Sequence, residues 1–144
     1  MKHRMIAAVL SLVGTLVSLY LWLWKIGWVG PVACGAEGGC ETVQFSDLAV
    51  IAGVPVAAFG VAGYAVLLVL SLVGLQERWV DERRITVGLA VLSGIGVLFT
   101  VYLTYLEAFV IHAWCRWCLG SAAIILAVFL AALAGLRRPA RTAE

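Results

Sequence analysis

Residues 114–136 read WCRWCLGSAAIILAVFLAALAGL, and this stretch decides the fold class. From Trp117 to Leu136 it carries no charged side chain, and about 20 apolar residues are enough to cross a hydrocarbon core about 30 Å thick. Two cysteines in a Cys-x-x-Cys spacing, Cys115 and Cys118, stand where the stretch begins. We therefore expect a membrane-spanning helix that carries two thiols at one boundary.

Three further uncharged stretches of similar length precede it, at residues 5–24, 48–75 and 85–106. The chain has 144 residues, of which 64% are hydrophobic and 12% charged, a balance that excludes an ordinary soluble domain. We predict an all-α polytopic membrane protein, a four-transmembrane-helix bundle that forms a single domain over residues 1–144. The expected helices run over about 5–26, 53–75, 85–110 and 115–136, and Ser46-Asp47 is expected to cap a short surface helix through Leu48–Ala52 in the first outer loop.

The basic residues are distributed unevenly along this path. Lys and Arg concentrate on the cytoplasmic side of membrane proteins. All but two of the 10 Lys and Arg residues fall on one side: Lys2, Arg4, Arg78, Arg83, Arg84, Arg137, Arg138 and Arg141. Lys25 and Arg116 fall on the other. This predicts cytoplasmic termini and places all cysteines on the outer face, where disulfides persist.

The Cys115–Cys118 spacing has a chemical rationale. Residues three apart share one face of a helix, which is close enough for a disulfide. Free N–H groups and the positive end of the helix dipole stabilise a thiolate at a helix start. The motif therefore favours redox chemistry, and the alternatives are a structural disulfide or half of a zinc site.

The other two cysteines, Cys34 and Cys40, lie in the loop after the first predicted helix with three glycines between them. Such a loop can close a disulfide and still move, although a purely structural staple is equally compatible with the spacing. All four cysteines could alternatively form one zinc site, which we do not favour because it would have no evident task at a membrane surface. Two pairs on one membrane face favour an electron relay by thiol–disulfide exchange.

Taken together, these motifs resemble the bacterial members of the vitamin K epoxide reductase family. The resemblance covers nearly the whole chain and is carried by Cys34-x5-Cys40, Ser46, Gly53-Val54-Pro55, Phe59-Gly60 and Trp114-Cys115-x-x-Cys118-Leu119. It implies a helical bundle around a quinone pocket near the outer face of a bacterial inner (cell) membrane. In such a protein, Cys34 and Cys40 take electrons from a thioredoxin-like (DsbA-like) partner. Cys115 and Cys118 then pass them to menaquinone or ubiquinone, which supports disulfide formation in exported proteins.

The resemblance also suggests residues that bind the quinone. Family position and side-chain chemistry point to Ser46, Phe59, Tyr64, Trp114 and Ala122. The chain departs from the vertebrate enzyme at two positions linked to vitamin K, where Val56 replaces an Asn and Ala122 a Tyr, and this favours simple quinone reduction over epoxide reduction. Since no thioredoxin-like segment is fused to the last helix, we expect the partner to be a separate protein.

Two other functions fit some of these features. A DsbB-type quinone reductase also has two outer cysteine pairs, but with the Cys-x-x-Cys in the first loop, the reverse of the order here. A non-catalytic membrane scaffold with two structural disulfides is the other possibility. Glu107, near the outer end of the third predicted helix, is more simply explained as an interfacial anchor than as a proton donor.

Overall fold

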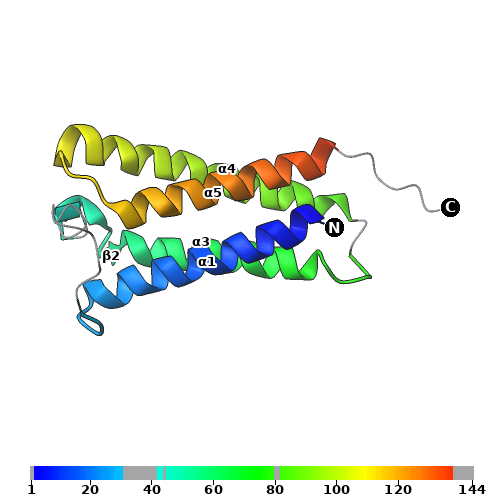
Figure 1. Ribbon diagram of the computed structural model, residues 1–144, viewed down its shortest axis with the longest axis horizontal. Coiled ribbons are helices and arrows are strands. Elements are labelled where there is room, and N and C mark those ends of the chain that lie inside the picture. Colours follow the sequence, from blue (N-terminus) through cyan, green and yellow to red (C-terminus); the bar gives the residue numbers. More distant parts are fainter. Residues whose placement is uncertain (1, 31–41, 44, 80–81, 138–144) are drawn as a thin grey trace.

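The computed structural model is an antiparallel bundle of four long helices, shown in Figure 1. It describes residues 2–30, 42–43, 45–79 and 82–137. The helices are α1 (Lys2–Lys25), α3 (Val56–Val73), α4 (Arg83–Leu106) and α5 (Arg116–Arg137). Each is long and apolar enough to cross a membrane. The predicted all-α membrane bundle is confirmed.

The helices do not contact one another evenly. Helix α1 packs extensively against α3 and α5, and α5 packs against α4, whereas contacts between α3 and α4 are much sparser. Where α3 packs on α1, a Cβ at Gly60 would lie 2.7 Å from the Ser18 Oγ, so only glycine fits there without a shift. The sparse α3–α4 seam leaves space within the bundle.

The surface of the bundle is apolar. Large side chains such as Leu98, at 71% exposure, and Val9, at 62%, point outward. Buried positions include small hydroxyl residues such as Ser71 and Ser93, which hydrogen-bond to carbonyls of their own helices. Apolar outside and small or polar inside is the distribution expected of helices surrounded by lipid.

At the end of the bundle where α1 ends and α5 begins, a short connection leads into α3 (Figure 1). A 3-10 turn, η1 (Asp47–Ala49), is followed by a minimal antiparallel hairpin of β1 (Val50–Ile51) and β2 (Val54–Pro55). The prediction of a short helix through residue 52 is wrong beyond Ala49. Ala52 and Gly53 have φ values of 52° and 81°, which make the tight turn that a two-residue hairpin requires, and the β-branched pair before them favours strand.

Helix α4 changes its geometry at the same end. Its last turn widens into a π-helix, η2 (Glu107–Ile111), and stops at His112, whose φ of 57° is left-handed. The Ala113 N–H donates to the Glu107 carbonyl at 3.1 Å, which closes the wide turn. A short extended segment then leads into α5.

The opposite end is held by one arginine. Arg4, on the first turn of α1, is buried and donates hydrogen bonds to the carbonyls of Gly74, Trp79 and Glu82 and to the Thr86 hydroxyl. These acceptors lie at the end of α3, in the connection to α4 and in its first turn. Arg4 therefore ties three helices together.

Candidate functional site

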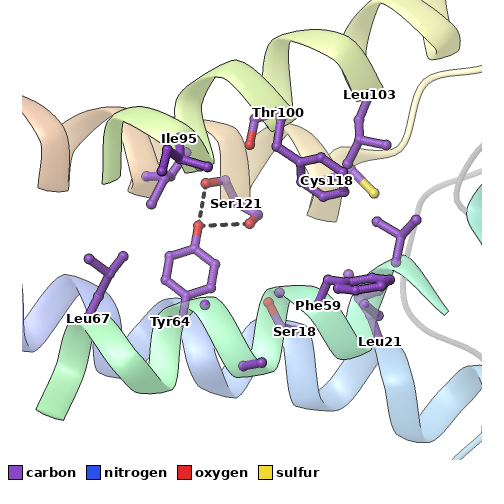
Figure 2. Close-up of a pocket in the computed structure, with 18 of the residues that line it drawn as sticks. Ser18, Leu21, Phe59, Tyr64, Leu67, Ile95, Thr100, Leu103, Cys118 and Ser121 are labelled. Carbon is purple, nitrogen blue, oxygen red and sulfur yellow. Dashed lines mark hydrogen bonds between the residues drawn. The ribbon is translucent and has the colours of Figure 1, made fainter. Parts of the chain in front are cut away.

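A cavity of about 600 Å³ lies in the sparse seam between α3 and α4, and residues of α1 and α5 also line it (Figure 2). Its walls are mostly apolar, with Phe59, Leu67, Ile95 and Leu103 among the residues that line it. A volume of this order is typical of small-molecule sites, which combine an apolar lining with a few polar groups.

Cys118 brings a reactive atom to the wall of this cavity. It lies in the first turn of α5, and its sulfur points toward the space between the helices, at the same end of the cavity as Phe59 on α3 (Figure 2). The Cys-x-x-Cys motif therefore borders an apolar cavity rather than open solvent.

Cys115 immediately precedes α5 and is fully buried. Its Sγ accepts a hydrogen bond from the Cys118 N–H at 3.4 Å, the contact that a capping side chain makes at a helix start. A sulfur in this position faces the free N–H groups and the positive end of the helix dipole, which stabilise a thiolate.

Glu107 lies beside both cysteines. Its Oε2 accepts the Cys115 N–H at 3.2 Å, and the side chain of Cys118 hydrogen-bonds to the same carboxyl group. Only 3% of the residue is exposed. The expectation of an anchor reaching toward water is therefore wrong, because the π-helical turn points this side chain inward.

Deeper in the cavity the polar groups are hydroxyls. The Tyr64 hydroxyl donates to the Ser121 carbonyl at 2.7 Å and lies 2.9 Å from the Ser121 Oγ (Figure 2). Thr100 and Thr104 of α4 also line the space. An apolar wall with a few hydroxyls suits a flat, largely apolar ring that carries carbonyl oxygens, so the residues present fit a quinone.

A second, smaller cavity of about 40 Å³ lies beside the large one. Glu107 and Cys118 line both cavities, while Ser46 and Val43 close the small one from the loop side. The Ser46 hydroxyl donates to the Val43 carbonyl at 2.8 Å.

The predicted binding residues fall in different places. Phe59 and Tyr64 line the large cavity, and Ser46 lines the small one. Of the described residues, Trp114 and Ala122 are outside the linings of both cavities, and their role in quinone binding stays a prediction. Trp114 is 54% exposed in the segment before α5, and Ala122 is rotated about 100° around the helix from Ser121. Cys34 and Cys40 lie outside the described residues.

Some cavity residues were not predicted. Ser121 and Ile125 follow Cys118 at spacings of three and seven residues, so helical periodicity from the cysteine would have identified this face. Thr100 and Thr104 share a face of α4 for the same reason. The sequence of α4 does not indicate which face of this helix turns toward the cavity.

The sequence model of the vitamin K epoxide reductase family matches residues 5–133. The match covers α3 and α4 completely and nearly all of α1 and α5. It also includes all four cysteines.

Proposed function

The chain belongs to the vitamin K epoxide reductase family and is therefore a membrane oxidoreductase, and we propose that it is a quinone-dependent thiol–disulfide oxidoreductase. In this proposal a thioredoxin-like protein delivers electrons to Cys34 and Cys40. Cys115 and Cys118 receive them and reduce a membrane quinone. The cycle supports disulfide formation in exported proteins.

The observation that carries the proposal is the position of Cys118 in the wall of an apolar cavity between membrane-spanning helices. Two thiols that become a disulfide release two electrons and two protons, and a quinone accepts both. A bilayer concentrates such an apolar acceptor beside these helices. A structural disulfide would have no need of a cavity of this size at its sulfur.

The chain's own residues supply position and electrostatics. The start of α5 favours the thiolate of Cys115, and the mostly apolar walls of the cavity favour an apolar ring there. The hydroxyls of Tyr64 and Ser121, together with Thr100 and Thr104, offer polar contacts for carbonyl oxygens deeper in the cavity. The bound quinone supplies the redox chemistry itself.

The positions of the basic residues in the bundle support one orientation of the protein across the membrane. Lys2, Arg83 and Arg137 lie at helix ends on one side of the bundle, whereas Cys115 and Glu107 lie on the other. By the positive-inside rule we place both termini in the cytoplasm of a bacterial cell and the cysteines on the outer face of its membrane.

The partner relay has a direct test. A thiolate of the partner attacks Cys34 of the Cys34–Cys40 disulfide, and Cys40 leaves. With Cys40→Ala the mixed disulfide between Cys34 and the partner has no internal thiol to resolve it, so we expect it to accumulate. Because Cys34 of this variant is a free thiol, the thioredoxin-like protein is supplied with only its attacking cysteine, activated as a thionitrobenzoate disulfide, so that thionitrobenzoate leaves as the mixed disulfide forms. Non-reducing electrophoresis and mass spectrometry of the purified proteins measure the product.

The double variant Cys34→Ala/Cys40→Ala is the matched control and should trap nothing. Partner oxidation at the wild-type rate by Cys34→Ala would show that the loop pair is not the entry point. The Cys115/Cys118 half of the proposal would then need another electron donor.

A further inference from the structure

Glu107 is a carboxyl residue held inside the protein beside the two sulfurs. It is 3% exposed, its Oε2 accepts the Cys115 N–H, and its carboxyl group hydrogen-bonds to the side chain of Cys118. Burying an ionisable group costs several kcal/mol unless it is well compensated. A neutral side chain such as Gln could hold the Cys115 N–H equally well, so anchoring alone does not explain a carboxyl group here.

The backbone is shaped to put the carboxyl group in this place. Glu107 opens the π-helical turn η2, and the turn ends at a left-handed His112. Single π-helical turns and left-handed non-glycine residues are locally unfavourable and occur frequently at functional sites. Here the distortion lies where the carboxyl group meets both cavities.

We propose that Glu107 is the acid–base residue that carries protons between the Cys115/Cys118 pair and the acceptor in the large cavity. This inference rests on the proposed quinone reduction. It assigns a role to a buried group that the cysteine relay by itself leaves unused.

Protons and electrons balance when Glu107 serves the two sulfurs in turn. Glu107, as carboxylate, accepts the proton of the Cys118 S–H and donates it to one carbonyl oxygen of the quinone. As the Cys115 thiolate bonds to the Cys118 sulfur, Glu107 takes up from water in the small cavity a proton equal to the one that Cys115 lost on becoming a thiolate, and passes it to the other oxygen. The two cysteines lose two electrons and two protons, the quinone gains both, and Glu107 ends as carboxylate.

The small cavity provides space for water between Glu107 and the loop before α3, and we take it as the proton route. Its volume of about 40 Å³ has room for a water molecule, for which about 10–15 Å³ is enough, and Ser46 and Glu107 offer polar partners. Protons can therefore be exchanged without opening the large cavity. Other titratable side chains near this end, within the described residues, include the exposed Asp47, His112 and Arg116, the half-buried Tyr20 and Lys25, and the buried Tyr64.

The test compares Glu107→Gln with Glu77→Gln, the same substitution at an exposed residue beyond the far end of α3. Both are made in a Cys34→Ala/Cys40→Ala background, reduced, and mixed with a short-chain ubiquinone under anaerobic conditions. General acid–base catalysis contributes at least about 100-fold to rate, so we expect Glu107→Gln to slow quinol formation by at least that factor. Glu77→Gln should leave the rate unchanged, and the thermal midpoint of Glu107→Gln should stay close to that of its parent.

A second measurement needs no quinone. In a protein that keeps Cys118 alone, with Cys115→Ser, Cys34→Ala and Cys40→Ala, the rate of alkylation by iodoacetamide is followed against pH. Because Glu107 and Cys118 share a hydrogen bond, their titrations are coupled and the profile should show two steps. Glu107→Gln should reduce the alkylation profile to one step, whereas His112→Gln should leave both steps in place.

These measurements distinguish a failure of the proposed quinone reduction from a failure of the acid–base role of Glu107. If the parent protein forms no quinol, the proposed function fails and the role of Glu107 fails with it. If the parent is active and Glu107→Gln reacts within about threefold of it, the proposed function stands and the acid–base role is wrong. A single-step alkylation profile in the parent also overturns that role, even if the Gln variant does not fold.

Discussion

At the scale of single residues, Tyr64 shows how the cavity is given a fixed shape. The residue is buried, and its hydroxyl bonds to both the carbonyl and the Oγ of Ser121. Its ring lies against Gly14 of α1, where an added Cβ would overlap the ring. One side chain on α3 therefore links α1 to α5, and a glycine makes room for it.

Removing this hydroxyl should have a measurable cost. A buried intramolecular hydrogen bond contributes about 0.5–1.5 kcal/mol, so we expect Tyr64→Phe to lower the free energy of unfolding by about 1 kcal/mol. Thermal or denaturant unfolding in detergent measures it. Tyr102→Phe, at a tyrosine that is 53% exposed, is the matched control and should be neutral. Equal stabilities for the two variants would show that the Tyr64 hydrogen bonds add nothing.

At the scale of elements, the long helices were predictable and the connections less so. Apolar length alone predicts four spans, and their observed starts lie within three residues of the expected ones. The hairpin at Val50–Pro55 was missed because a two-residue turn depends on φ values that the sequence Ala52-Gly53 only permits. The π-helical turn was missed because residues 107–111 are as compatible with an α-helix as those before them.

The candidate site was likewise predictable from the sequence only in part. The Cys-x-x-Cys spacing places Cys115 and Cys118 at a helix start, which follows from local geometry and was predicted. That Glu107 turns inward depends on the wide last turn of α4, and the cavity depends on how α3, α4 and α5 sit together. Neither property belongs to any one segment of sequence.

At the scale of the whole molecule, the bundle has two ends with different tasks. Cys115, Cys118, Glu107 and the small cavity lie at one end, and the Arg4 hydrogen bonds lie at the other. From sequence, Arg4 is one of several basic residues that orient the chain. In the structure it is also buried and joins α1 to the connection between α3 and α4.

This second role makes Arg4 a stability residue. Hydrogen bonds to a charged group contribute about 1.5–3 kcal/mol, and Arg4→Ala removes several at once, so we expect a loss of at least about 2 kcal/mol. Lys2→Ala, which removes an exposed positive charge from the same turn, is the matched control and should cost little. Thermal unfolding in detergent compares them, and equal midpoints would mean that the helices are held together without Arg4.

The central claim is that the Cys115/Cys118 pair delivers two electrons to a quinone in the cavity that Cys118 borders. Its most direct measurement is a single anaerobic turnover of the reduced Cys34→Ala/Cys40→Ala protein with a short-chain quinone. Absorbance follows quinol, and mass spectrometry follows the cysteines. We predict one quinol for each protein, formed together with a Cys115–Cys118 disulfide. Absence of quinol, or quinol formed at an undiminished rate after Cys118→Ser, would contradict the claim.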